Sequence, residues 1–175
     1  MTHLTPISGA ADKLELYAQA HEQLSALLKG ETDQIANSAN AASLLSRLLP
    51  EVNWFGFYFL KDGELVLGPF QGKPACTRIR LGEGVCGKAA AEQTTVIVPD
   101  VNAFPGHIAC DTDSQSEIAI PMLNWGNLVG VLDVDSPTPN RFDEDDAEGL
   151  EIVASILLET FVSDYLPDLS EEAAG

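Results

Sequence analysis

"NWFGFYFL", residues 53–60, is the stretch in which the chain changes from a helical hydrophobic period to the two-residue period of a β-strand. This alternation places Trp54, Gly56 and Tyr58 on one face of the strand and three phenylalanines on the other. An Asp-Gly pair follows at 62–63, before the apolar segment "ELVLG". Since Asp-Gly favours a tight hairpin turn, the stretch predicts an antiparallel hairpin.

Two helices are predicted before this hairpin. Apolar residues recur at helical spacing over 14–28, and Gly30 ends the pattern. A second helix is expected from about residue 33 to 49, with Thr32 as a possible cap and Pro50 as the terminator.

The segment after the hairpin has a less regular pattern. Residues 69–88 are rich in Gly and Pro, and we expect no core strand there. A short helix is predicted over 86–93 and a strand over 94–99. A long loop, residues 99–116, then leads to the second half of the sheet.

A second hairpin and a last helix complete the predicted fold. The strands are expected over 117–123 and 128–135, and Pro121 indicates an edge or a bulge because proline cannot donate to the ladder. The amphipathic segment 140–162 predicts a helix with acidic residues at its dipole-favoured N-terminus. Helices combined with antiparallel hairpins predict an α+β domain, which by itself names no function.

Length and charge limit the classes of partner. We expect one domain over residues 1–175, with an ordered core of about 12–164 and an acidic C-terminal tail. The formal net charge of −18 argues against nucleic acid and anionic membrane surfaces, because both require clustered Lys or Arg. No signal peptide or transmembrane run is visible, so a cytoplasmic location with reduced thiols is expected.

The three cysteines, Cys76, Cys86 and Cys110, are the first candidates for chemistry. They contain no C-x-x-C redox motif and no close pair of the kind that binds structural zinc, and His107 with Cys110 is only a weak metal pattern. No metal is therefore predicted. Inert burial and thiol chemistry both stay open, since core cysteines are common but these three lie in or beside Gly/Pro-rich segments.

Acidic residues of the second hairpin form another candidate group. Asp133 and Asp135 share one face of their strand, either solvated at the open end of the hairpin or positioned to receive a cation. Glu117 begins the partner strand. A simple turn pairs it with Val134, whereas a one-residue bulge places it opposite Asp135 on the acidic face.

The aromatic residues of the first strand have two interpretations. Trp54 and Tyr58 are compatible with simple core packing. Gly56 between them would alternatively leave a notch for a small apolar group, such as a methyl.

With these residues assembled, the sequence resembles the free methionine-(R)-sulfoxide reductases, which are stand-alone GAF-domain enzymes. The resemblance covers most of residues 53–146 and is carried by four segments: "NWFGFYFL", "LGPFQGKPACTRIRLGEGVCGKAA", "VPDVNAFPGHIACDTDSQSEIAIP" and "GVLDVDSP". It implies a GAF fold and the reduction of free methionine sulfoxide, with the R preference coming from the resemblance alone.

The resemblance also implies roles for the three thiols. Cys110 matches the catalytic cysteine, which attacks the sulfoxide sulfur and becomes a sulfenic acid. Cys76 matches the cysteine that resolves it as a disulfide. Cys86 matches a third cysteine, which assists recycling or lies near the site. Recycling by thioredoxin and a homodimeric assembly are expected, with no metal or organic cofactor.

The remaining site residues follow from the same resemblance. Glu117, Asp133 and Asp135 match active-site carboxylates that bind the substrate ammonium, with Glu117 or Asp135 as the general acid. Trp54 and Tyr58 match the aromatic wall around the substrate methyl group. The alternatives are a GAF sensor module that binds a small ligand without catalysis, and a general thiol peroxidase.

Overall fold

The computed structural model describes residues 13–106 and 113–161. The helices in this part of the chain are α1 (Lys13–Leu28), α2 (Gln34–Leu48), α3 (Gly84–Glu92) and α4 (Glu144–Leu158), with a 3₁₀ turn at Val101–Ala103. The strands are β1 (Trp54–Lys61), β2 (Glu64–Gln71), β3 (Arg78–Arg80), β4 (Val96–Val98), β5 (Ser116–Asn124) and β6 (Asn127–Ser136). They form one antiparallel sheet in the order β3-β2-β1-β6-β5-β4, which confirms the predicted α+β class.

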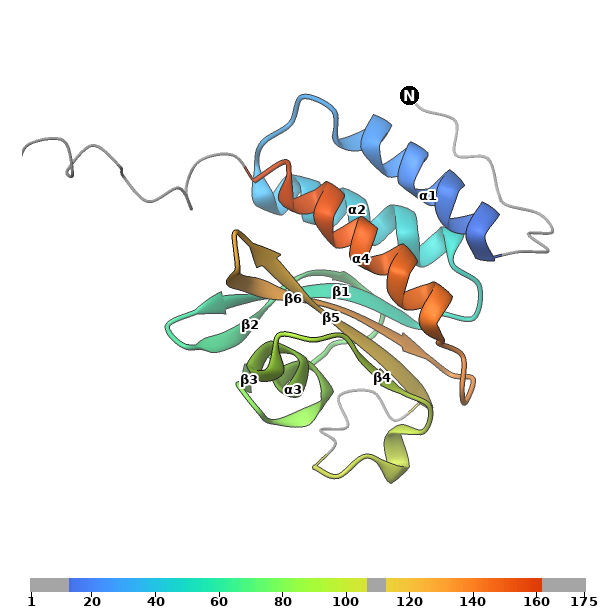
Figure 1. Cartoon of the computed structure of the whole chain (residues 1–175), viewed down its shortest axis with the longest axis vertical. Coiled ribbons are helices and arrows are strands. Elements are labelled where there is room, and N and C mark those ends of the chain that lie inside the picture. The colour runs from blue at the N-terminus through green and yellow to red at the C-terminus, as the bar shows by residue number, and fades with distance from the viewer. Residues whose placement is uncertain (1–12, 107–112, 162–175) are drawn as a thin grey trace, which may run out of the picture.

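The two faces of the sheet are covered differently (Figure 1). Helices α1, α2 and α4 lie together on one face, and α3 lies on the opposite face. Phe55, Phe57 and Phe59 point into the core under the three helices, whereas Trp54 and Tyr58 point to the α3 side. The period-two pattern of β1 therefore predicted both faces correctly.

The first hairpin has the predicted Asp-Gly turn, and Trp125 and Gly126 of the second hairpin have φ values of 51° and 79°. Asp62 and Gly63 have φ values of 52° and 81°, the left-handed pair of a type I′ turn. At Pro121 both predicted features are present: a register shift follows between Met122 and Leu123, and the described pairing of β4 with β5 ends at Ala119. Proline is thus accommodated where β4 no longer needs a donor.

Several predicted boundaries were wrong. The segment 69–88 is not wholly irregular, because β2 continues to Gln71 and β3 lies within the segment. The next helix starts at Gly84, two residues before the predicted start. Asp33, not Thr32, caps α2 by accepting a 2.8 Å hydrogen bond from the backbone N–H of Ala36. These differences arise because strand pairing and cap geometry, not local composition, set where elements begin.

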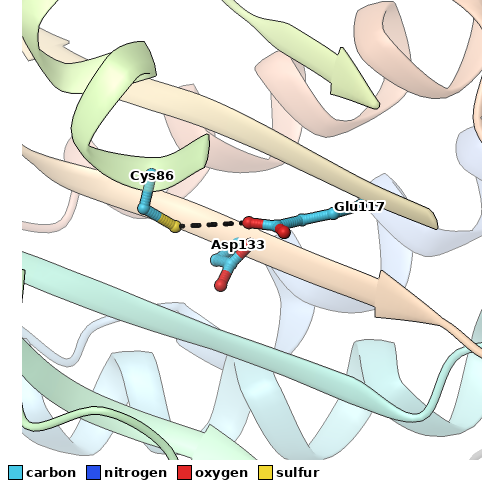
Figure 2. A group of neighbouring side chains, drawn as sticks. All are labelled: Cys86, Glu117 and Asp133. Carbon is cyan, nitrogen blue, oxygen red and sulfur yellow. Dashed lines mark hydrogen bonds between the residues drawn. The ribbon is translucent and has the colours of Figure 1, made fainter. Parts of the chain in front are cut away.

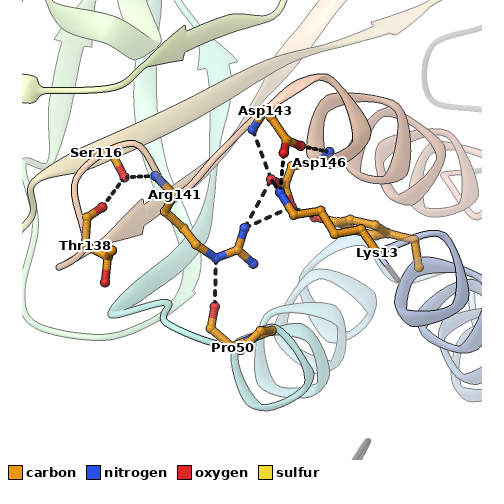
Figure 3. A network of polar contacts seen from close by, with 8 residues as sticks. Lys13, Pro50, Ser116, Thr138, Arg141, Asp143 and Asp146 are labelled. Atoms are coloured by element: carbon orange, nitrogen blue, oxygen red, sulfur yellow. Dashed lines mark hydrogen bonds and ion pairs between the residues drawn. The ribbon is translucent and has the colours of Figure 1, made fainter. Parts of the chain in front are cut away.

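A buried polar network fixes the segment between β6 and α4 (Figure 3). The Arg141 guanidinium donates to both carboxylate oxygens of Asp146 at 3.1 Å, and Lys13 Nζ lies 2.6 Å from the same carboxylate. The backbone N–H of Arg141 donates to Ser116 Oγ at 3.3 Å, and that hydroxyl donates to the Thr138 carbonyl at 2.7 Å. The network therefore joins α1 and α4 to the first residue of β5.

No helix in the described part of the chain has the length and apolarity needed to cross a bilayer.

Candidate active site

Three side chains from three elements converge on the α3 face of the sheet (Figure 2). Cys86 comes from α3, Glu117 from β5 and Asp133 from β6. The Cys86 Sγ lies 3.9 Å from Glu117 Oε1, and one ligand atom from each residue lies within 4.8 Å of the others. All three residues are buried, with exposed fractions of 3%, 7% and 6%. We call these residues the thiol–carboxylate cluster.

The register of the second hairpin decides which acids share this face. Glu117 pairs with Asp135 and not with Val134, so the bulge alternative is the correct one. Asp133 pairs with Ala119 on the same ladder. Because directly opposite residues point to one side of a sheet, Glu117, Asp133 and Asp135 all face α3.

Burial and crowding raise the pKa values of the two acids in the cluster. Desolvation, followed by the charge of Asp135, raises the pKa of Glu117 well above its usual value. Desolvation and the charge of Glu117 raise the pKa of Asp133 in the same way. A hydrogen bond between the two carboxyls lowers the pKa of Glu117 and raises that of Asp133, so the shared proton belongs more to Asp133. The sequence predicts Glu117 or Asp135 as the acid and Asp133 as a binding group, whereas the structure raises the pKa of Asp133 as well as that of Glu117.

The same surroundings disfavour a thiolate at Cys86. Desolvation raises its pKa well above the usual value, and the neighbouring charges of Asp133 and Glu117 act in the same direction. The buried thiol is therefore neutral and donates to Glu117. This environment is opposite to that of an activated nucleophile.

An aromatic stack adjoins the cluster. The ring centroids of Trp54 and Tyr58 lie 6.0 Å apart, and Phe70 stacks on Trp54 at 5.4 Å. A Cβ atom at Gly56 would lie 2.5 Å from both the Trp54 ring and Phe70 Cβ. The predicted notch at Gly56 is therefore wrong as a place for a ligand methyl, since the protein's own side chains fill it. Sequence reasoning missed Phe70, whose register partner is Gly56.

Trp54 also anchors the segment that carries Cys76. Its indole N–H donates to the Lys73 carbonyl at 3.1 Å. Gly72 packs so closely that a Cβ there would lie 2.5 Å from the Trp54 ring. Cys76 follows three residues after Lys73, is partly buried and is disulfide-bonded, whereas Cys86 is a free thiol. Trp54 thus connects the face of the sheet that carries the thiol–carboxylate cluster to Cys76, the predicted resolving cysteine.

Cys110, His107 and Asp111 lie outside the described residues, and the predictions on them are untested. Asp113, for which the sequence indicated no role, is exposed and forms an ion pair with Lys73. The structure thus brings Cys86, Glu117 and Asp133 together and places Asp135, Trp54 and Tyr58 on the same face of the sheet.

An antiparallel sheet, with three helices on one face and a buried thiol–carboxylate cluster on the other, is the arrangement of a GAF-domain protein. The sequence comparison agrees with this class, because a model described as GAF domain matches residues 38–158.

Individual relatives narrow the class further. The chain is 57% identical to Protein YtsP of Bacillus subtilis over 159 residues, covering 90% of this chain and 96% of the relative. It is 46% identical to free methionine-R-sulfoxide reductase of Escherichia coli over 155 residues, covering 88% of this chain and 94% of that protein. The solved structure of free methionine-R-sulfoxide reductase from Neisseria meningitidis, in complex with its substrate, is 45% identical and superimposes with a TM-score of 0.85, covering 90% of this chain and 95% of that chain. The chain belongs to the free methionine-R-sulfoxide reductase family, a family of oxidoreductases.

Proposed function

We propose that this chain reduces free methionine-R-sulfoxide to methionine, with Cys110 as the nucleophile. The observation that carries the proposal is the thiol–carboxylate cluster, a group of buried side chains with raised pKa values on the face that also carries Trp54 and Tyr58. Membership of the reductase family supports the choice of substrate.

The chemistry balances with thiols alone. The Cys110 thiolate attacks the sulfoxide sulfur, the oxygen is transferred to the cysteine sulfur, and methionine leaves. The substrate gains two electrons, and Cys110 loses two as it becomes a sulfenic acid. Cys76 then attacks the sulfenic sulfur, releases water and forms a disulfide, which an external dithiol such as thioredoxin reduces. The disulfide-bonded state of Cys76 supports this resolving role.

The cluster supplies the proton that the sulfoxide oxygen requires. A carboxyl whose pKa is raised by burial carries a proton near neutral pH and donates it as negative charge develops on the oxygen. Asp133 fits this task because its pKa is raised by burial, by the charge of Glu117 and by their shared hydrogen bond. A neutral Cys86 donating to Glu117 assists the acid site, which favours the near-site role over recycling.

The same acids select a free amino acid. The ammonium group of methionine sulfoxide requires carboxylate neighbours, and Glu117 and Asp135 provide them on the face that also carries the acid Asp133. The stacked rings of Trp54 and Tyr58 lie on the same face and are our candidates for contact with the methyl end. A GAF sensor without catalysis would share the sheet, but it would have no use for the buried proton donors. Thioredoxin as reductant, a homodimer and a cytoplasmic location belong to the same proposal.

The first test is a reductase assay with purified protein, dithiothreitol and free methionine-R-sulfoxide. Cys110→Ser should lose methionine formation by a factor of about 10³ or more, because no thiolate is left to attack. Cys76→Ser should keep single-turnover methionine formation and lose thioredoxin-supported turnover. Activity in the Cys110→Ser variant would contradict the assignment of the nucleophile.

Peptide-bound methionine sulfoxide tests the recognition of the ammonium group. An acylated nitrogen carries no charge, so kcat/KM should fall by a factor of about 10² or more relative to the free amino acid. Comparable values for the two substrates would contradict the role of the carboxylates in binding.

A further inference from the structure

We propose that Cys86, Glu117 and Asp133 also form a binding site for a divalent, borderline-soft metal ion such as Zn²⁺, which excludes the substrate and acts as an inhibitor. Binding of the metal is independent of the proposed reductase function. The inhibition rests on that function, because Glu117 and Asp133 are both assigned to the substrate there.

The donor set matches this class of metal. One sulfur and two carboxylate oxygens are typical ligands of Zn²⁺, whereas Ca²⁺ and Mg²⁺ require oxygen ligands in larger number. A tetrahedral zinc ion with a zinc–sulfur distance of about 2.3 Å and zinc–oxygen distances of about 2.0 Å separates its sulfur and oxygen ligands by roughly 3.5 Å. The Cys86 Sγ lies 3.9 Å from Glu117 Oε1, and the three ligand atoms lie within 4.8 Å of one another. A small contraction of side chains therefore completes the geometry.

A second observation points to a ligand at this place. The buried Oδ1 atom of Asp133 has no hydrogen-bond partner among the described residues. Asp133 is only 6% exposed, so bulk water does not readily replace the missing partner. An unsatisfied buried carboxylate oxygen is costly, and coordination to a cation removes that cost.

The three ligands are held by separate, well-anchored elements. Cys86 lies on α3, whose close contact with the end of β3 is fixed at Gly87: a Cβ there would lie 2.3 Å from the Arg80 carbonyl. Glu117 and Asp133 lie on neighbouring strands of one ladder. Three protein ligands leave the fourth tetrahedral position for water, and the ion offsets the negative charge that the ligands acquire on binding.

The binding test uses a full-length variant in which Cys86 is the only thiol. The chain has three cysteines, so the double variant Cys76→Ser/Cys110→Ser meets this condition. Titration with Co²⁺ should produce a sulfur-to-cobalt charge-transfer band in the near ultraviolet with a stoichiometry of one, and Zn²⁺ should abolish it by displacement. Far-ultraviolet circular dichroism checks that each variant is folded.

Further substitutions in this background assign the ligands. Cys86→Ser should remove the band, and Asp133→Asn should weaken Co²⁺ affinity at least tenfold. The control Glu148→Gln, at an exposed position of α4, should leave the affinity unchanged. Absence of the band in the folded double variant would overturn the site. An unchanged affinity in Asp133→Asn would also overturn it, because the thiol would then bind without the carboxylate.

Competition is measured in the same double variant, which binds substrate without turning it over. Methionine-R-sulfoxide should bind the metal-free variant in a calorimeter and should abolish the cobalt band. Binding of the sulfoxide without loss of the band would overturn the shared site. Failure of the sulfoxide to bind would instead contradict the proposed function, while the band would still support the metal site.

Discussion

At the scale of single residues, the notable feature is how the acids near the thiols differ in their surroundings. Asp113 is exposed and ion-paired with Lys73, whereas Glu117 and Asp133 are buried beside each other. The exposed acid has no assigned chemistry. Burial and neighbouring charge raise the pKa values of this pair, which is the environment that the proton donation proposed above requires.

The raised pKa of Asp133 predicts a dependence of stability on pH. Its unfolded pKa is about 3.9, and its folded pKa is higher. Between these two values the folded protein binds more protons than the unfolded chain. The wild-type protein therefore loses stability as pH rises through that window, and it does not regain the loss above the folded pKa. Asp133→Asn removes the loss and should gain stability relative to wild type as pH rises, by on the order of 1 kcal/mol.

The measurement is urea unfolding of both proteins between pH 4 and 8, with a chelator present to exclude metal ions. Glu148→Gln, the exposed control, should shift stability by the same small amount at every pH. A difference between Asp133→Asn and wild type that does not change with pH would contradict the assignment of the raised pKa.

The aromatic residues show what a sequence pattern does not contain. Alternation along β1 correctly placed Trp54 and Tyr58 on the cluster side. It did not show that Phe70 of β2 stacks on Trp54 and helps to fill the space at Gly56, because that contact depends on the pairing of two strands. The pattern along one strand predicts which side chains share a face. The side chains of the neighbouring strand decide whether the space between them is filled.

At the scale of elements, α3 controls the geometry of the cluster. It is short, and its contacts with β5, β6 and the loop after β3 position Cys86 over the two acids. Gly87 permits this close approach because it has no Cβ. Its carbonyl also accepts a 2.7 Å hydrogen bond from the Gly82 N–H. The sequence predicted a helix here but started it at Cys86, because the first turn has no side-chain cap to mark it.

Gly87→Ala should therefore damage both stability and activity. The added Cβ would lie 2.3 Å from the Arg80 carbonyl, so the helix must move away from the sheet and take Cys86 with it. We expect a loss of about 1–3 kcal/mol in unfolding free energy and at least a tenfold loss in kcat/KM. The matched control is Ala91→Gly, at an exposed position of the same helix, which should cost at most about 1 kcal/mol and leave activity unchanged. Wild-type activity in Gly87→Ala would show that the position of α3 is not critical.

The second hairpin shows the same limit of local patterns. The sequence left two registers open for Glu117, and the structure has the one with a bulge between Met122 and Leu123. The turn residues 124–127, "NWGN", are compatible with either register. The bulge keeps Ile118 and Ile120 in the core under the helices while Glu117 faces α3. Core packing across the whole sheet, and not the turn itself, selects the register.

At the scale of the whole molecule, the Arg141–Asp146 ion pair connects the helical layer to the site. Both side chains are buried, and the backbone of Arg141 bonds to Ser116, the neighbour of Glu117. Asp143 caps α4 in a capping box with Asp146. The sequence predicted acids at the start of α4 because negative side chains stabilise the positive end of the helix dipole. It did not predict their pairing with Arg141 and Lys13.

Asp146→Ala should destabilise the fold strongly. It leaves the buried Arg141 guanidinium without its carboxylate, which typically costs about 3–5 kcal/mol. Glu64→Ala, which removes the half-buried partner of Arg78 and Arg80 at the surface, is the control and should cost about 0–1 kcal/mol. Chemical denaturation measures both. A loss below about 1 kcal/mol for Asp146→Ala would show that the network does not hold the layers together.

The sequence by itself determined the α+β class, the two faces of β1, the hairpin turns and the set of residues that resemble a reductase site, because these depend on local period, turn chemistry and residue identity. Only the tertiary structure decided that Cys86 lies against Glu117 and Asp133, that Phe70 and Trp54 fill the space at Gly56, and that burial raises the pKa of Asp133. The physical reason is that burial and proximity between distant segments set a pKa and close a gap. Neither quantity exists until the strands have paired and α3 has packed on the sheet.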